Sequence, residues 1–143
     1  MKRMQVTRNG GSLEGIVGKH VYGNLYGCDP ALLGNLRVLR KWVAEAAKVA
    51  RMNLVAVKGW KFGGEKGGVS VLAIVTESHV AVHTWPYYGY ATVDIFTCGD
   101  ESDPDAAFDL ICRYLSPEKV VRHFADRSSM ITSFQESYSH AGD

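Results

Sequence analysis

The chain has 143 residues, of which 46% are hydrophobic and 10% aromatic, and its formal net charge is +1. This size and composition fit one folded domain with a hydrophobic core and exclude a disordered chain. The small net charge predicts neither nucleic acid nor an acidic membrane surface as a partner. No apolar run approaches the ~20 residues of a membrane helix, and the N-terminal residues lack the apolar stretch of a secretory signal, so we expect a cytoplasmic protein.

Residues 1–14 are polar and predict a flexible arm, followed by a single domain over 15–127 and a polar tail over 128–143. The expected elements, in chain order, are a strand at 16–26, a helix at 30–52 begun by Asp29-Pro30, strands at 53–60, 69–76, 79–85 and 90–98, a helix begun by Asp103-Pro104, and a strand at 118–125. Four glycines in 61–68 predict a flexible loop, and 86–89 is turn material.

This order of elements predicts an α/β (α+β) fold, a two-layer sandwich in which both helices cover one face of a mostly antiparallel sheet. The other face of the sheet would then have no helix on it. We therefore expect an oligomer in which a second copy covers that face and produces a multi-layer αββα arrangement.

Polar residues gather in the segment VTESHVAVHTWPYYGYATVDIFTC, where the pattern otherwise indicates two sheet strands. Alternation places five side chains on one face of the second strand: Tyr90, Thr92, Asp94, Phe96 and Cys98. His83 lies on the neighbouring strand and is expected to approach either Cys98 or Asp94; the spacing does not decide between them. A Ser-His hydrolase is disfavoured because no G-x-S-x-G elbow is present, whereas a nucleophilic Cys98–His83 pair stays open.

Metal and disulfide chemistry receive little support from the sequence. Cys28, Cys98 and Cys112 are far apart and none belongs to a C-x-x-C pair, which disfavours a disulfide framework or a thiolate zinc site. His79 and His83 are four apart and share a face of a strand, but no H-x-x-x-H pattern lies on a predicted helix. We therefore expect no metal.

The segments ESHVAVHTWPYYGYATVDIFTCGD, GKHVYGNLYGCDP, GGVSV and ADRSS span roughly residues 16–129. Together they resemble the S-adenosylmethionine decarboxylase family of small archaeal and bacterial pyruvoyl enzymes, which includes a crenarchaeal branch that decarboxylates arginine. The resemblance implies a self-cleaving proenzyme. The hydroxyl of Ser78 attacks the carbonyl of Glu77, His83 helps remove the α-proton of Ser78, and Ser78 becomes a pyruvoyl group. The products are a β chain, 1–77, and an α chain, 78–143.

The same resemblance implies how the mature enzyme works. The pyruvoyl group forms a Schiff base with the substrate amine and takes the place of pyridoxal phosphate, with no metal. Cys98 is the proton donor to the α-carbon, and Ser70 falls at a position that lines the processing site. The processed protomers are expected to assemble as a dimer or a tetramer of α/β pairs.

Differences between this sequence and the adenosylmethionine enzymes that it resembles bear on the substrate. Adenosylmethionine enzymes of the family usually read HTWPEYGY, and their glutamate holds the ribose; here Tyr87 stands in its place, after Trp85. Phe62 fits the position of a ring that stacks on adenine, but the following GGEKGG loop looks like the arginine branch. The proline of WPYYGY, by contrast, is typical of the adenosylmethionine type.

A guanidinium group needs a carboxylate partner, for which Glu65, Asp94 and Asp29 are candidates, although Asp29 is already expected to cap a helix. The sequence therefore favours decarboxylation of L-arginine to agmatine for polyamine synthesis. Decarboxylation of adenosylmethionine for spermidine synthesis is the alternative, and a non-catalytic partner subunit is the second alternative.

One feature of the expected strand conflicts with this chemistry. Ser78 and His83 are five residues apart, so a regular strand would point them to opposite faces. The mechanism thus requires a turn, bulge or strained bond near Glu77–Ser78.

Overall fold

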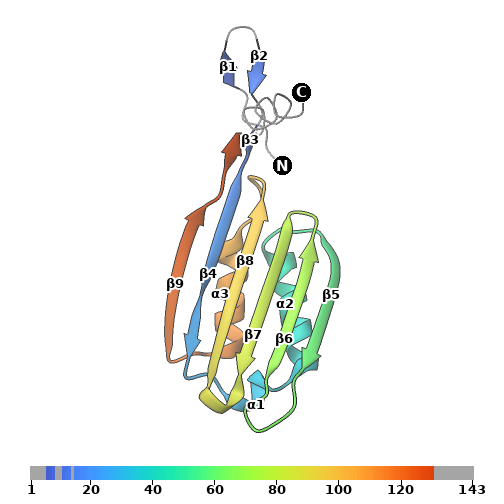
Figure 1. The fold of residues 1–143 in the computed structure, drawn as a ribbon, viewed down its shortest axis with the longest axis vertical. Helices are drawn as coiled ribbons and strands as arrows, with labels where there is room; N and C mark the ends of the chain where they lie inside the picture. The colour runs from blue at the N-terminus through green and yellow to red at the C-terminus, as the bar shows by residue number, and fades with distance from the viewer. Residues whose placement is uncertain (1–5, 9–10, 14, 131–143) are drawn as a thin grey trace, which may run out of the picture.

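A computed structural model describes residues 6–8, 11–13 and 15–130 (Figure 1). The strands are β1 (Val6–Arg8), β2 (Gly11–Leu13), β3 (Gly15–Ile16), β4 (Gly18–Tyr26), β5 (Leu54–Lys61), β6 (Val69–Val75), β7 (Ser78–Trp85), β8 (Tyr90–Cys98), β9 (Lys119–Asp126) and β10 (Ser129–Met130). The helices are α1 (Pro30–Leu33), α2 (Leu36–Val49), α3 (Pro104–Leu115) and the short 3-10 helix η1 (Pro86–Tyr88).

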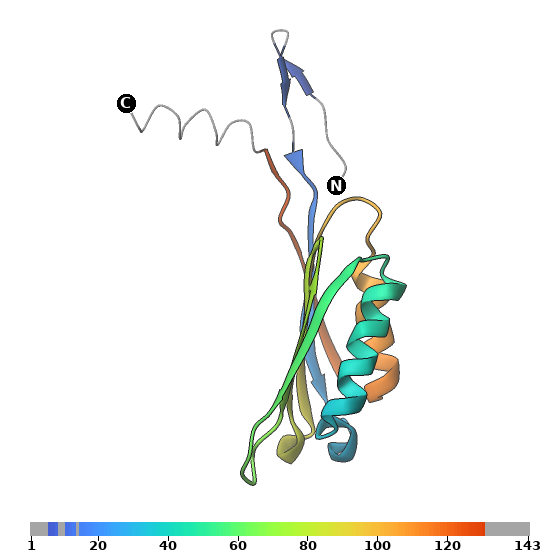
Figure 2. The same ribbon diagram turned by 90° about the vertical axis from the view of Figure 1, so that its right-hand side faces the viewer.

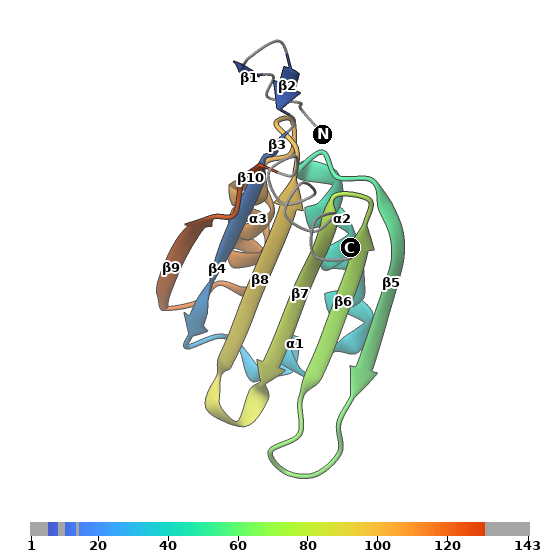
Figure 3. The ribbon, with the colours of Figure 1, turned by 45° about the horizontal axis from the view of Figure 1, so that its top comes forward.

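Six strands form one sheet in the order β5-β6-β7-β8-β4-β9, and every neighbouring pair is antiparallel (Figure 3). The helices α2 and α3 pack on one face of this sheet, and the opposite face carries no helix (Figure 2). The predicted two-layer sandwich with helices on one side is confirmed. We call the face without helices the open face.

The hydrophobic core lies between the sheet and the two long helices. Every second residue of β8 from Ala91 to Thr97 is buried, and Phe108 of α3 and Leu39 of α2 are at most 2% exposed. The alternate residues of β8, Tyr90 to Cys98, are half-buried. They lie on the open face, as the alternation predicted, so Asp94 is kept out of the core, whereas Thr97 is a polar residue on the buried face.

Capping side chains set the helix starts. Asp29 Oδ1 accepts a hydrogen bond from the backbone N–H of Ala31 at 2.9 Å, and Asp103 Oδ1 accepts one from Ala106 at 3.1 Å. Each cap is followed by proline at the first helical position, where the missing N–H costs no hydrogen bond. Both predicted helix starts are confirmed.

The single helix expected over 30–52 is wrong, because the structure has two helices there. Asn35 has extended backbone angles, and its Oδ1 accepts the N–H of Val38 at 3.2 Å, so it caps a new helix. The second helix also ends earlier, at Val49, and Arg51 takes a left-handed φ of +59°. An apolar periodicity continued across this cap and hid the break.

The chain ends contribute short strands. β1 pairs with β2, and β3 pairs with β10, which lies beyond the domain end expected at 127 (Figure 3). The remaining parts of the expected arm and tail lie outside the described residues. Within the described ranges, none of the helices is long and apolar enough to cross a membrane.

Candidate active site

Ser78 begins β7, and its backbone departs from ordinary strand geometry. Its φ is +148°, a value that non-glycine residues rarely adopt. Its hydroxyl lies 3.7 Å from Sγ of Cys98, the last residue of β8. Alternation from His83 would assign Ser78 to the helix-covered face, whereas Cys98 belongs to the open face. The distortion predicted near Glu77–Ser78 is confirmed, and it is what brings hydroxyl and thiol together.

Glu77, the residue before Ser78, is held by three hydrogen bonds. Its carbonyl oxygen accepts the backbone N–H of Cys98 at 2.8 Å. Its carboxylate accepts the backbone N–H of Asn53 at 3.0 Å on Oε2 and the Asn53 side-chain amide at 2.7 Å on Oε1. Burial raises the pKa of Glu77, but the hydrogen bonds from Asn53 and Thr76 outweigh it and hold that pKa below its usual value.

A hollow of about 540 Å³ adjoins this end of β7. Its lining comes from the connection between α2 and β5, the turn before β7, and the end of β8 with the loop after it: Arg51, Asn53, Glu77, Cys98, Gly99, Asp100, Glu101 and Ser102. The peptide bond between Glu77 and Ser78 therefore lies beside an open space and not within the core.

Ser70 and His83 form a second pair farther along the sheet. They are register partners on β6 and β7, and Ser70 Oγ lies 2.7 Å from Nδ1 of His83. His83 is five residues beyond Ser78 on the same strand, which corresponds to about 17 Å at the usual strand rise. The single chain thus separates His83 and Ser70 from Ser78 and Cys98, although the resemblance assigns Ser78, His83 and Ser70 to the same self-processing reaction.

Asp94 lies between two histidines on the open face. His79 Nε2 is 2.9 Å from Oδ1 of Asp94, and His20 Nε2 is 3.0 Å from Oδ2. Burial raises the pKa of Asp94, but its bonds to His79 and His20 outweigh burial and hold that pKa below its usual value. Among the described residues, neither pairing weighed for His83, with Cys98 or with Asp94, is formed.

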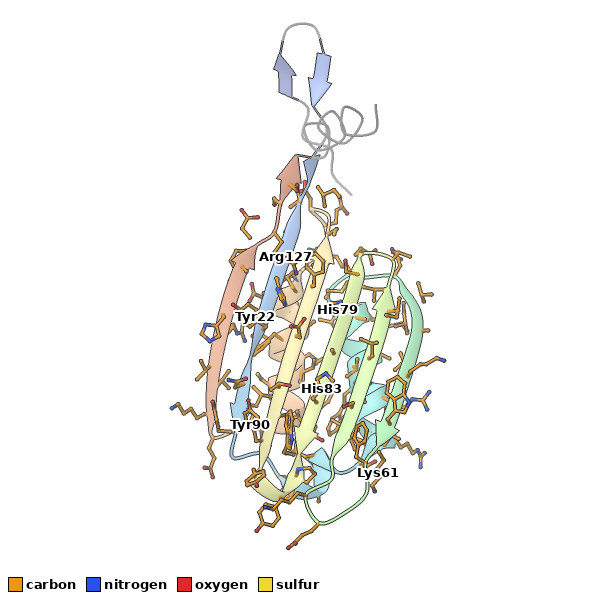
Figure 4. All side chains as sticks on the ribbon, in the orientation of Figure 1. Tyr22, Lys61, His79, His83, Tyr90 and Arg127 are labelled. Carbon is orange, nitrogen blue, oxygen red and sulfur yellow. The ribbon has the colours of Figure 1, made fainter. Side chains whose placement is uncertain are left out.

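The candidate substrate-binding residues, Asp94 excepted, lie toward the far end of the sheet, where β7 finishes and β6 begins (Figure 1). Phe62 and Glu65 belong to the loop after β5, and Tyr87 lies in η1. Trp85 ends β7, and its ring centroid lies 5.2 Å from that of Tyr90. Figure 4 shows His79 nearer the start of β7 and His83 nearer Tyr90.

Lys66 connects the loop to the aromatic residues of η1. Its Nζ lies 5.3 Å from the ring centroid of Tyr87 and 5.8 Å from that of Tyr88. Both rings are more than half exposed. The position that usually carries glutamate in the adenosylmethionine enzymes therefore carries an aromatic ring that receives a cation.

Two parts of the site were not found from the sequence. Asn53 is 24 residues from Glu77, and no local pattern links the two. His20 and His79 both pair with Asp94 because β4 and β7 flank β8 in the sheet. The sequence predicted which residues share a face of one strand, but it did not predict the order of the strands. Across the described part of the chain, no group of three or more His, Cys, Asp or Glu side chains lies close enough to hold a metal ion.

Comparison with known proteins bears on this arrangement. The profile of a family described as S-adenosylmethionine decarboxylase matches residues 19–128. The chain belongs to this family. An arginine decarboxylase proenzyme of Ignicoccus hospitalis is 60% identical over 114 residues, which are 80% of this chain and 79% of that protein. An arginine decarboxylase proenzyme of Hyperthermus butylicus is 58% identical over 128 residues, 90% of this chain and 88% of that protein.

A solved structure shares the fold. The crystal structure of the adenosylmethionine decarboxylase from Aquifex aeolicus VF5 superposes with a TM-score of 0.71 at 31% identity, covering 78% of this chain and 90% of that one. The S-adenosylmethionine decarboxylase family is pyruvoyl-dependent. The residues at the start of β7 fit such a group, because a serine with strained backbone follows a carbonyl that is already hydrogen-bonded.

Proposed function

We propose that this chain is a self-processing, pyruvoyl-dependent decarboxylase that converts L-arginine to agmatine and carbon dioxide. The observation that carries the proposal is the Glu77–Ser78 bond: a serine at φ +148°, a thiol 3.7 Å from its hydroxyl, and a backbone N–H 2.8 Å from the preceding carbonyl oxygen. The names of the two relatives at about 60% identity support the substrate.

Self-processing begins with a shift of the peptide bond to an ester. Ser78 Oγ bonds to the carbonyl carbon of Glu77, the carbon–nitrogen bond breaks, and the hydroxyl proton passes to the nitrogen. The N–H of Cys98 already points at the carbonyl oxygen on which negative charge develops. The strained φ of Ser78 raises the energy of the starting amide relative to the ester.

Elimination then cleaves the chain. A base, His83 by the family resemblance, removes the α-proton of Ser78, and the Cβ–Oγ bond breaks to leave Glu77 as a free carboxylate. Water replaces the amino nitrogen of the resulting dehydroalanine, ammonia leaves, and position 78 ends as a keto group. The products are fragments 1–77 and 78–143.

A pyruvoyl group at position 78 would supply a carbonyl for the substrate amine and an electron sink for the loss of carbon dioxide. Cys98 then acts as the proton donor to the α-carbon. Its thiol lies beside position 78, and a thiol holds its proton near neutral pH and releases it to a strong base.

The separation of the two pairs supports an oligomeric site. A gap of about 17 Å is too long for His83 to reach Ser78 of its own chain, but two sheets packed face to face lie only ~10 Å apart and interdigitate their side chains. A two-fold axis lying between the two open faces and perpendicular to the strands would reverse one β7 against the other. His83 and Ser70 of one copy then lie opposite Ser78 and Cys98 of the partner.

The open face has the composition that such packing needs. Several of its large side chains are more than a third exposed in the single chain: Tyr22, Tyr26, Trp60, Ile74 and Trp85. A face of this kind on a soluble chain indicates a partner surface. We therefore include in the proposal a dimer, or a tetramer, of processed protomers.

A guanidinium substrate agrees with the far end of the sheet. Lys66 already occupies the face of Tyr87, so this ring accepts a cation, and Glu65 in the same loop supplies a carboxylate. Adenosylmethionine is the second candidate substrate, favoured by the solved neighbour from Aquifex aeolicus. Tyr87 disfavours it because a phenol does not replace a carboxylate that binds two ribose hydroxyls.

Two measurements test the proposal in order. Intact-mass analysis of the purified protein should give two fragments; one uncut chain of 15.7 kDa would instead indicate a non-catalytic subunit. Carbon dioxide released from arginine and from adenosylmethionine, offered in parallel, then identifies the substrate. Release from adenosylmethionine alone would overturn the assignment to arginine.

A further inference from the structure

Asn53 sits at a rigid junction between α2 and β5. Arg51 lies two residues after the end of α2, has a left-handed backbone, and donates from Nε to the carbonyl of Glu101 at 2.7 Å. Met52 is only 5% exposed and anchors the chain in the core. The backbone of Asn53 is therefore fixed on its N-terminal side before the strand begins.

Asn53 is also fixed to the turn that precedes Ser78. Its carbonyl oxygen accepts the N–H of Thr76 at 2.9 Å, one step beyond the first β5–β6 register pair. Its own N–H and its side-chain amide hold the two carboxylate oxygens of Glu77 at 3.0 and 2.7 Å. One residue thus makes three hydrogen bonds to the two residues before the cleavage point.

The hydrogen bonds from Asn53 hold Glu77, the residue whose carbonyl carbon is attacked in self-cleavage. With the carboxylate held by Asn53 and the carbonyl held by the N–H of Cys98, the peptide plane of Glu77 is fixed from two sides. A backbone as strained as that of Ser78 persists only where its surroundings hold it. Release of one side would let Glu77 turn and move its carbonyl away from the Ser78 hydroxyl.

We propose that Asn53 is a positioning residue for self-cleavage, and that the Glu77 side chain is required because it is what Asn53 holds. This inference rests on the proposed function, since it concerns the rate of the same bond-breaking step. Misplacement of reacting groups by ~1 Å can slow a reaction by about a hundredfold. Asn53→Ala should therefore slow the appearance of the two fragments by about tenfold to a hundredfold.

The test follows cleavage of freshly made full chain by intact mass over time. Asn35→Ala is the matched control, because it removes an asparagine that caps the same helix at its other end without touching Glu77. Thermal unfolding of both variants is measured alongside. Slow cleavage in Asn53→Ala with wild-type cleavage in Asn35→Ala is the expected result; equal rates in wild type and Asn53→Ala would overturn the inference.

An exchange of partners separates positioning from folding. Asn53→Asp sets a carboxylate against that of Glu77, so cleavage should be slow at pH 7 and should recover relative to wild type as the pH falls towards 5. The double variant Asn53→Asp/Glu77→Gln restores a donor–acceptor pair and should cleave within about threefold of wild type at pH 7. Arg51, Asp100 and Glu101, which line the adjacent hollow, are the same in every variant.

The positioning role would be contradicted if the double variant cleaved as slowly as Asn53→Asp. It would also be contradicted if the ratio of the Asn53→Asp cleavage rate to the wild-type rate did not change with pH. These outcomes differ from failure of the proposed function itself. In that case the wild-type chain would stay uncut, whatever residue stands at position 53.

Discussion

The two ends of β7 carry polar groups in different surroundings. At its start, Ser78 has a strained backbone, its neighbour Glu77 is held by three hydrogen bonds, and Cys98 lies 3.7 Å from the hydroxyl. Toward its other end, His83 bonds Ser70 on a regular antiparallel register and lies on the open face. Apart from Ser78, no described residue of β6 or β7 has a positive φ.

The difference indicates a division of labour. In our proposal the start of β7 breaks its own peptide bond, since the hydroxyl of Ser78 and the thiol of Cys98 are close and the Glu77 carbonyl is already hydrogen-bonded. The far end offers a base, aromatic rings and a loop lysine, but no bond for them to act on within the same chain. Each end thus supplies what the other lacks, which is why two copies make one site in our account.

The largest expected effect is at Ser78. Ser78→Ala removes the hydroxyl that attacks the Glu77 carbonyl in our proposal, so cleavage should be abolished. Intact mass should show a single chain of about 15.7 kDa after prolonged incubation. Ser70→Ala serves as the comparison, because it retains the attacking hydroxyl and should cleave slowly but measurably. Cleavage of the Ser78→Ala chain would show that Ser78 is not the residue that attacks the Glu77 carbonyl.

Cys98 should separate processing from catalysis. Cys98→Ala keeps the backbone N–H that holds the Glu77 carbonyl, so the chain should still be cut. Its turnover of arginine should fall by about a hundredfold to ten-thousandfold, the usual contribution of a positioned proton donor. Cys112→Ala, a half-buried cysteine in α3, is the matched control. Full activity of processed Cys98→Ala would assign the proton donor elsewhere.

Tyr87 tests the far end with a smaller effect. A cation over an exposed aromatic ring contributes about 0.5–1 kcal/mol, so Tyr87→Ala should raise KM for arginine by about two- to fivefold with kcat little changed. Tyr87→Phe retains the ring and should behave as wild type. An effect of equal size in both variants would show that the hydroxyl, not the ring face, contacts the substrate.

The smallest expected effect concerns Asp94 and stability in acid. The pKa of Asp94 is lower in the folded protein than its usual value, so its contribution is present above pH ~4 and is lost as the pH falls through the lower folded value. Urea midpoints of Asp94→Asn should therefore fall less steeply than those of wild type between about pH 4 and pH 2. Parallel curves would show that His20 and His79 do not stabilise the carboxylate.

Much of the fold was readable because two local signals agree with the global structure. Alternation along β8 separates its buried and open faces correctly, and Asp29-Pro30 and Asp103-Pro104 begin helices. The break between α1 and α2 was missed because the apolar spacing runs on through Asn35, whose capping role depends on backbone angles. Periodicity reports which face is apolar, and not where a helix stops.

The sequence predicted most residues of the candidate site, but not how they are arranged in space. The distortion at Ser78 followed from a parity argument, since an odd spacing from His83 cannot share a face without one. The distance between the two pairs could not be predicted, because family motifs give residues in order and omit which copy supplies them. Asn53 had no signal at all, because its contact with Glu77 exists only after β5 and β6 pair.

Mixing two inactive variants tests the divided site most directly. Ser78→Ala retains Ser70 and His83, whereas His83→Ala retains Ser78 and Cys98. Each should stay uncut alone, and co-expression should cut the His83→Ala chain only, with arginine decarboxylation restored in part. If neither chain is cut in the mixture while mixed oligomers form, both ends of β7 would have to act within one chain, and our account of the site would be wrong.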